Sequence, residues 1–190
     1  ICPTCGHPLG NHKDCKICKS LNPAFDHIRA WALFVPPLDR IIHSFKYERK
    51  PSLAHLLGRS MARVAESDPL LKEAQYLIPV PLYKGRQRER GYNQAELLSR
   101  VIKEEIKKEV LNCLIRTRNT PTQTRLTEFE RKQNVLGAFS LSGGISIQGR
   151  SVILIDDVMT TGATLNECAR VLKEAGADRV YGLICAVAPV

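Results

Sequence analysis

The chain has 190 residues, 44% of them hydrophobic, which suits one α/β domain with a small appendage and a packed core. No apolar run approaches the ~18–20 residues that span a membrane, and no secretory signal is visible, so we expect a cytoplasmic protein without membrane insertion. Lys and Arg outnumber Asp and Glu by 28 to 19, a net charge of +9 that indicates a polyanionic partner, either nucleic acid or a phosphorylated small molecule. Charge alone supports a merely basic, solvated surface about equally well.

Two Cys-x2-Cys pairs separated by nine residues stand near the amino terminus: Cys2, Cys5, Cys15 and Cys18. Each pair can hold one metal ion from a tight turn, and two pairs complete a tetrahedral thiolate site for Zn²⁺. Disulfides are the alternative, disfavoured because the other cysteines lie in predicted core elements and nothing marks the chain as secreted. We therefore predict a structural zinc finger over residues 1–22. Because four thiols fill the site, His7 and His12 are expected to face solvent.

Beyond the finger, the apolar pattern alternates between strands and helices. In chain order the predicted elements are a strand at 30–35, helices at 38–48 and 52–66, a strand at 76–82, a helix at 92–110, a strand at 112–117, a short helix at 127–136, a strand at 151–155, a helix at 165–174 and a strand at 179–188. Pro79 and Pro81 must lie at the end of their strand, because neither can donate to a β-ladder. The alternation predicts an α/β fold with a mainly parallel, doubly wound sheet over residues 28–190.

The stretch SVILIDDVMTTGATLNE, residues 151–167, contains the most informative pattern. Its first five residues are typical of a strand buried on both faces, and the helix after it has apolar residues along one face. Asp156 and Asp157 and the threonines after them are therefore predicted to lie in a strand-to-helix turn. Such a turn lies at the carboxyl edge of a parallel sheet, where ligands bind in open α/β proteins.

The residue types in this turn suit a sugar phosphate. Backbone N–H groups, hydroxyls and a helix N-terminus can hold a phosphate, and two carboxylates beside them can accept hydrogen bonds from the vicinal hydroxyls of a ribose. Together they indicate ribose 5-phosphate. Alternatively, the acids only cap the helix and the threonines satisfy the turn backbone. A cap needs one acid, however, and does not explain Thr160, Thr161 and Thr164 around Gly162. Neither a P-loop nor a Rossmann glycine pattern is present.

The segment VILIDDVMTTGATL resembles the motif with which type I phosphoribosyltransferases bind 5-phosphoribosyl 1-pyrophosphate (PRPP). The whole chain resembles the ComF family of competence proteins, of the ComFC type, in its four-Cys finger and in the segments IIHSFKYERKPSLAHLLG, IPVPLYKGRQRERGYNQAELL and RTRNTPTQTRLTEFERKQNVLGAF. The resemblance implies a type I phosphoribosyltransferase fold behind a zinc finger. It also implies a role in natural transformation, in which single-stranded DNA is moved into the cytoplasm beside a helicase partner.

The resemblance also implies roles for individual residues. Asp156 and Asp157 would bind the ribose hydroxyls. The residues that would hold the 5-phosphate are Thr160, Thr161, Gly162, Ala163 and Thr164. The loop that would meet the pyrophosphate consists of Pro81, Leu82 and Tyr83, with Lys84 directly after it. Mg²⁺ would bridge the pyrophosphate oxygens, as expected for a diphosphate held by few protein ligands.

Basic residues gather in two further segments. The first follows the pyrophosphate loop and contains Arg86, Arg88 and Arg90, which are predicted to neutralise pyrophosphate or a nucleic-acid backbone, a solvated helix start being the alternative. Tyr92 stands where a base could stack, although packing is the commoner role of a single tyrosine. The second segment is a long polar connection at 117–134, typical of a lid. The arginines assigned to it are Arg116, Arg118, Arg125 and Arg131. Glu128 and Glu130 are candidate general bases, with surface pairing to these arginines the favoured interpretation.

Two hypotheses follow from different classes of function. The first is a competence protein that handles single-stranded DNA and binds PRPP or another ribose 5-phosphate ligand. The alternative is an active phosphoribosyltransferase that transfers ribose 5-phosphate to a nitrogenous acceptor. The sequence does not identify the acceptor, because acceptor pockets vary freely on this fold.

Overall fold

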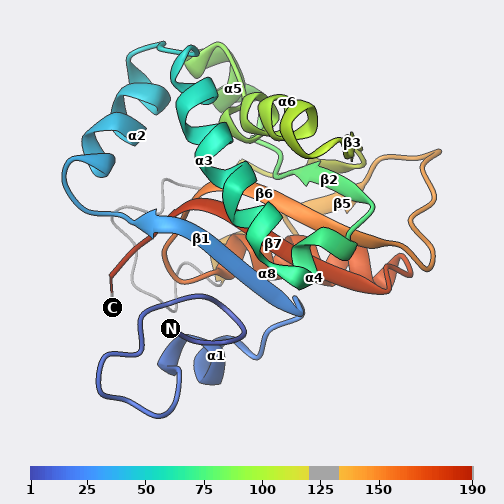
Figure 1. Ribbon diagram of the computed structural model, residues 1–190. Helices are drawn as coiled ribbons and strands as arrows, with labels where there is room; N and C mark the ends of the chain where they lie inside the picture. Colours follow the sequence, from blue (N-terminus) through green and yellow to red (C-terminus); the bar gives the residue numbers. More distant parts are fainter. Residues whose placement is uncertain (120–132, 190) are drawn as a thin grey trace.

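The computed structural model describes residues 1–119 and 133–189 (Figure 1). Its helices are α1 (Lys16–Leu21), α2 (Leu38–Tyr47), α3 (Leu53–Ser67), α4 (Pro69–Glu73), α5 (Lys84–Arg90), α6 (Gln94–Ile106) and α8 (Ala163–Glu174). Its strands are β1 (His27–Leu33), β2 (Tyr76–Pro79), β3 (Glu109–Val110), β4 (Leu114–Arg116), β5 (Phe139–Leu141), β6 (Ser151–Met159) and β7 (Arg179–Val187).

Five strands form one parallel sheet in the order β1-β7-β6-β2-β3, and β4 and β5 form a separate antiparallel pair. The two longest strands, β6 and β7, lie at the middle of the sheet, and almost all of their residues are buried. Such continuous burial is expected for parallel strands covered on both faces. The predicted fold class is confirmed.

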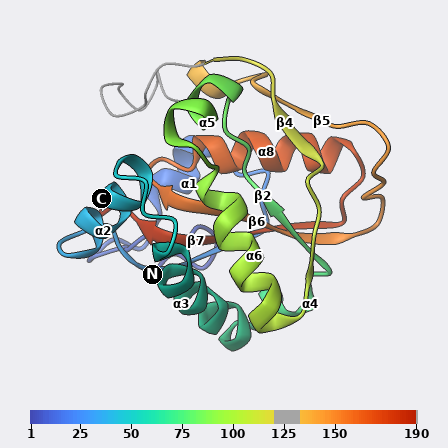
Figure 2. The same cartoon turned by 90° about the horizontal axis from the view of Figure 1, so that it is seen from above.

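Alternate residues of β6 enter two different cores. Val152 and Leu154 pack with α8 and the amino-terminal segment, whereas Ile153 and Ile155 pack with α2, α3, α4 and α6. Figures 1 and 2 show these two layers on opposite sides of the sheet. The period of two residues along a strand therefore distributes one run of aliphatic side chains over both layers. Within the described residues, no helix has the length and apolar character needed to cross a bilayer.

Several predicted boundaries were wrong by a few residues. The first strand begins at His27 and not at residue 30, because residues 27–30 pair with 181–184 of β7. The helix predicted at 92–110 begins beside Asn93, whose side chain accepts a hydrogen bond from the Ala95 amide, but it ends at Ile106. Lys107 then adopts a left-handed conformation (φ 55°), and Glu109–Val110 pairs with β2 as an edge strand. Most of the predicted helix at 127–136 lies outside the described residues.

A substitution at Gly182 of β7 would test how closely β1 and β7 pack. It is the register partner of Ile28 in β1, and a Cβ atom at this position would lie 2.7 Å from Ile28 Cγ1. Because overpacking a core commonly costs about 1–3 kcal/mol, Gly182→Ala should lower the free energy of unfolding in urea by that amount. Gly143→Ala is the matched control, because nothing lies within 4 Å of its added methyl group. Equal stability of the two variants would contradict this packing.

Candidate functional site

The two acids lie inside strand β6, not in the turn after it. Asp156 pairs with Ile184 of β7 in the ladder, and β6 continues to Met159. The prediction that both carboxylates belong to the strand-to-helix turn was therefore wrong, because the ladder to β7 extends four residues further than the aliphatic run suggested. The turn itself consists of Thr160, Thr161 and Gly162, and it leads directly into α8.

The turn leaves the N-terminus of α8 without a side-chain cap. Gly162 occupies the N-cap position in a left-handed conformation (φ 76°), which glycine adopts without steric cost. Thr161 accepts a hydrogen bond at Oγ1 from the Ala163 amide (3.5 Å), so this hydroxyl serves the turn backbone, as the alternative interpretation expected. Residues 158–165 and Asp156 line a hollow of about 20 Å³, roughly the room that one water molecule needs. An anion would therefore lie on the rim of the turn.

Lys46, at the end of α2, reaches the acid pair. Its Nζ lies 2.7 Å from Asp157 Oδ1, and the Asp157 side chain is only 9% exposed. This residue was not among the sequence predictions, because nothing in the local pattern of α2 says that its last turn faces β6. Burial and then the charge of Asp157 raise the pKa of Asp156 to about 7, although Lys46 and Arg116 act in the opposite direction. One partly buried ammonium group therefore does not fully neutralise two adjacent carboxylates.

Arginines surround the same edge of the sheet. Arg116 on β4 lies over the ring of Phe139 in β5, with the guanidinium carbon 5.2 Å from the ring centre. Burial lowers the pKa of Arg116, Asp156 raises it, and the charges of Arg86 and Arg90 lower it further. Charges from β6 and from α5 therefore both act on Arg116. The small antiparallel sheet thus brings a cation to the acid pair from a distant part of the sequence.

The predicted pyrophosphate loop begins beside Asp156. The Val80 amide donates to the Ile155 carbonyl (3.0 Å), so Pro81, Leu82 and Tyr83 leave the sheet next to the acids. All three are partly exposed, and Lys84 is exposed at the start of α5. The buried side-chain amide of Asn93 donates to the Val80 carbonyl (3.1 Å) and fixes the base of the loop. The sequence therefore placed this loop on the correct edge.

The remaining basic candidates have different surroundings. Arg88 is exposed and Arg86 partly buried on α5, whereas Arg90 donates to Gln94 Oε1 (2.9 Å) and stacks on Tyr47 at 5.0 Å from the ring centre. Tyr92 donates to the Phe45 carbonyl (2.6 Å), so it packs and does not stand ready to stack a base. Four candidates in the 117–134 connection lie outside the described residues: Arg125, Arg131, Glu128 and Glu130.

The four cysteines of the amino-terminal segment form one cluster. Their Sγ atoms all lie within 4.8 Å of one another, with Cys2 and Cys18 3.7 Å apart and Cys5 and Cys15 3.4 Å apart. Thiolates on a tetrahedral Zn²⁺ are separated by about 3.8 Å, given Zn–S bonds of ~2.3 Å. All seven cysteines of the chain lie in the described residues, and all are free thiols. The donor set therefore fits a metal ion.

Electrostatics explains why this cluster suits a cation. Burial raises the pKa of Cys5 well above its ordinary value and that of Cys18 to about 12. For Cys2 burial acts in the same direction, but hydrogen bonds from the amides of Cys5 and Thr4 outweigh it and lower the pKa to about 7. The four thiols could not all ionise together without a nearby positive charge. A divalent cation supplies that charge, and its binding would release protons.

His7 was expected to face solvent, and that prediction was wrong. The residue is 1% exposed, and its Nε2 donates to the backbone carbonyl of Thr160 (2.8 Å). His12, by contrast, is exposed as expected. The difference arises because the amino-terminal segment packs against the turn before α8, which brings His7 to the site while His12 remains on the outside.

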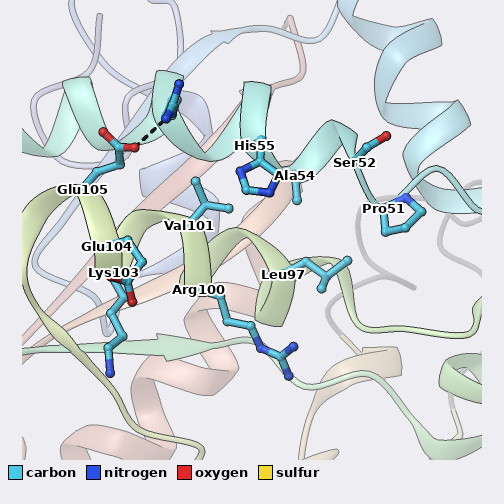
Figure 3. Close-up of a pocket in the computed structure, with 11 residues that line it drawn as sticks. Pro51, Ser52, Ala54, His55, Leu97, Arg100, Val101, Lys103, Glu104 and Glu105 are labelled. Atoms are coloured by element: carbon cyan, nitrogen blue, oxygen red, sulfur yellow. Dashed lines mark hydrogen bonds and ion pairs between the residues drawn. The ribbon is translucent and has the colours of Figure 1, made fainter.

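A second cavity lies away from the sheet edge, between α3 and α6 (Figure 3). It has a volume of about 820 Å³, and its lining includes Leu97 and Val101 together with charged residues of both signs. Arg59 and Glu105 form an ion pair across it (3.0 Å). None of its lining residues belongs to the acid pair, the turn or the loop at 81–83. The two hollows are therefore separate sites.

Comparison with known proteins agrees with this arrangement. The Phosphoribosyl transferase domain family matches residues 88–188, which include the acid pair and the turn. The chain is 36% identical to competence protein F of Haemophilus influenzae, over 96% of this chain and 83% of that protein. It is 30% identical to competence protein ComFC of Bacillus subtilis, over 93% of this chain and 72% of that protein. The chain belongs to the ComF family of competence proteins.

Among solved structures, this ComF-family chain is similar to the glutamine PRPP amidotransferase of B. subtilis complexed with ADP and GMP, at 22% identity and a TM-score of 0.47. The match covers 70% of this chain and 26% of that longer chain. The family match over residues 88–188 and the parallel sheet confirm the phosphoribosyltransferase fold expected from the ComF resemblance, with the acid pair on its central strand.

The raised pKa of Asp156 predicts a pH-dependent stability. Between about pH 4 and pH 7 the folded protein retains a proton that the unfolded chain releases, so the free energy of unfolding should fall as the pH rises through this range. Asp156→Asn removes the ionisation. In urea denaturation, the free energy of unfolding of this variant should exceed that of the wild-type protein by more at pH 8 than at pH 5. The excess should grow by about 1 kcal/mol or more between the two pH values.

Asp26 provides a control of opposite sign. Burial alone would raise its pKa, but Lys173, the Val180 amide and Arg179 lower it, so the ionised form stabilises the fold above its ordinary pKa. Asp26→Asn should therefore be less stable than the wild-type protein at both pH values. If the stability of Asp156→Asn depends on pH in the same way as that of the wild-type protein, folding does not raise the pKa of Asp156.

Proposed function

We propose that this ComF-family protein binds PRPP, or another ribose 5-phosphate ligand, at the edge of β6 and acts in the uptake of single-stranded DNA during natural transformation. The observation that carries the proposal is the convergence of two carboxylates on β6 with an uncapped, glycine-containing helix N-terminus. A sugar phosphate has hydroxyl donors at one end and an anion at the other. These two features offer the matching acceptors and donors.

Each part of the ligand then has a place. Asp156 and Asp157 accept hydrogen bonds from the ribose hydroxyls, and the ion pair with Lys46 holds the Asp157 side chain in position. Residues 160–164 hold the 5-phosphate on the rim of the turn. The pyrophosphate lies towards residues 81–84, near the positive charge of Arg116. Mg²⁺ would neutralise the pyrophosphate oxygens when it is bound, with few protein ligands of its own.

The basic surface beside this site suits single-stranded DNA. The chain carries a net charge of +9, and α5 places Arg86 and Arg88 directly after the loop at 81–83. We include in the proposed surface Arg116, which is partly buried, and Arg125 and Arg131, which lie outside the described residues. Phosphate contacts of this kind bind without sequence preference. A helicase-type competence partner in the cytoplasm would use the strand after its entry.

The amino-terminal cysteines complete the assignment. We propose that residues 1–22 bind one structural Zn²⁺ through Cys2, Cys5, Cys15 and Cys18, because thiolate ligands at these separations suit zinc. Residues 28–190 then form the phosphoribosyltransferase-like domain. All four ligand positions are occupied by protein, so the ion would bind no water for catalysis.

Ligand binding is favoured over turnover. Competence protein F and competence protein ComFC are among the relatives that match most of this chain, and the chain covers 83% and 72% of their lengths. Transfer of ribose 5-phosphate to a nitrogenous acceptor remains the alternative function. It would require a general base, and the two candidates in the 117–134 connection lie outside the described residues.

The acid pair provides the direct test of the ligand site. Asp156→Ala combined with Asp157→Ala removes two charge-assisted acceptors, each worth roughly 1.5–3 kcal/mol, so PRPP affinity in the presence of Mg²⁺ should fall about a hundredfold or more. Isothermal calorimetry measures this loss. Glu66→Ala combined with Glu104→Ala removes the same charge from exposed positions on α3 and α6 and should leave the affinity unchanged. Equal affinity of all three proteins would show that the acids are not ligands.

The basic surface is tested with single-stranded DNA. Affinity for an oligonucleotide should fall steeply as salt rises, because phosphate contacts release counterions. Arg86→Glu with Arg88→Glu should weaken binding to every sequence and reduce the salt slope by about two. The control, Arg63→Glu with Lys72→Glu, makes the same change of charge at exposed positions on α3 and α4. A DNA affinity that is insensitive to salt, or equally weakened by both pairs, would rule out a specific binding surface on α5.

A further inference from the structure

The zinc finger and the residues directly after it contact the turn before α8 and the first turn of that helix at three places. His7 Nε2 donates to the carbonyl of Thr160 (2.8 Å). Leu21 in α1 packs so closely against Gly162 that a Cβ atom there would lie 3.2 Å from Leu21 Cδ2. The Ala24 amide donates to Asn166 Oδ1 in the first turn of α8 (2.6 Å). A segment that merely preceded the domain would not need contacts with both the turn and the start of α8.

The hydrogen bond from His7 fixes the orientation of one peptide group. A carbonyl oxygen only accepts, so Nε2 of His7 carries the proton. A trans peptide is planar, and its N–H points opposite to its C=O. With the Thr160 carbonyl directed at His7, the amide of Thr161 points away from the finger. Rotation of this peptide would instead turn a carbonyl, with its partial negative charge, towards a ligand anion.

His7 is itself held by the cysteine cluster. Its ring Nδ1 lies 3.5 Å from Cys5 Sγ, and its carbonyl accepts a hydrogen bond from the Cys2 amide (2.8 Å). The ring is 1% exposed, so it has little room to move independently of the cysteines on either side. An ion that joins the four thiolates would therefore also fix the place of His7.

We propose that His7 is a positioning residue for the phosphate-binding turn, and that metal in the four-Cys cluster maintains this role. The inference rests on the proposed function of the turn, but it adds a residue and a dependence that the motif at 156–164 does not contain. The finger thus belongs to the ligand site. Loss of the metal loosens residues 160–164 while the acids on β6 remain in place.

Three substitutions of His7 separate its hydrogen bond from its volume. His7→Gln places an amide nitrogen close to the position of Nε2 and should keep PRPP affinity within about threefold of the wild-type value. His7→Asn is too short to reach Thr160, and His7→Phe fills the space without a donor. Both should weaken PRPP binding with Mg²⁺ about tenfold, the effect of one lost hydrogen bond. His12→Asn, an exposed histidine in the same segment, is the control and should behave as wild type.

Two further measurements show whether a variant is specifically altered. Zinc content should remain one per chain in every variant. Amide hydrogen exchange of residues 160–164 should accelerate in His7→Asn and His7→Phe but not in His7→Gln, and removal of zinc by a chelator should accelerate it in the wild-type protein. A variant that loses zinc has an altered finger, so its exchange at residues 160–164 is compared with that of the zinc-free wild-type protein. The proposal predicts equal rates for the two.

The outcomes distinguish this inference from the proposed function. If the wild-type protein binds no PRPP, the proposed ligand is wrong, and the exchange rates alone decide whether His7 and zinc hold the turn. If the wild-type protein binds PRPP and His7→Asn binds it equally well with unchanged exchange at 160–164, the positioning role of His7 is overturned. Unchanged exchange after zinc removal would overturn the role of the metal.

Discussion

The parallel pairing of β6 with β7 on one side and β2 on the other is the constraint on which the rest of the structure depends. Because these strands are parallel, their carboxyl ends lie at the same edge of the sheet. The acids of β6, the turn before α8 and the loop after β2 meet at this edge. It also sends alternate aliphatic residues of β6 into two cores, so the helical layers on either side are tied to one strand. The site therefore rests on the central strands of the sheet.

Charge at this edge is arranged so that a ligand can balance it. Asp157 pairs with Lys46 from α2, and the charge of Arg116 on β4 acts on the neighbouring Asp156. The raised pKa of Asp156 shows that the protein alone leaves this acid poorly stabilised in its ionised form. Hydroxyl donors of a ribose would stabilise the carboxylate, and the phosphates would balance the arginines. A ligand with both hydroxyl donors and phosphates thus matches an edge that carries both carboxylates and cations.

The sequence predicted those features that depend on local patterns. The periodicity of α3 and α8 and the cysteine spacing depend on neighbours that are close in the sequence. The contacts of Lys46 with Asp157 and of His7 with Thr160 depend on packing between distant segments, and no local pattern encodes them. The acids were assigned to the turn because the aliphatic run ends at Ile155, and only the register with β7 shows that β6 continues through them. The edge strand β3 was missed for a similar reason, because its two residues follow a helical pattern without a break in polarity.

The central claim is that the junction of β6 and α8 binds a sugar phosphate, and the position of a bound ligand tests it most directly. A crystal structure of the protein with ribose 5-phosphate would show where phosphorus and hydroxyls lie. We predict phosphorus on the rim of the turn at 160–164 and the ribose hydroxyls within hydrogen-bonding distance of Asp156 and Asp157. Ribose 5-phosphate bound instead between α3 and α6, or with its phosphate directed away from the N-terminus of α8, would contradict this account.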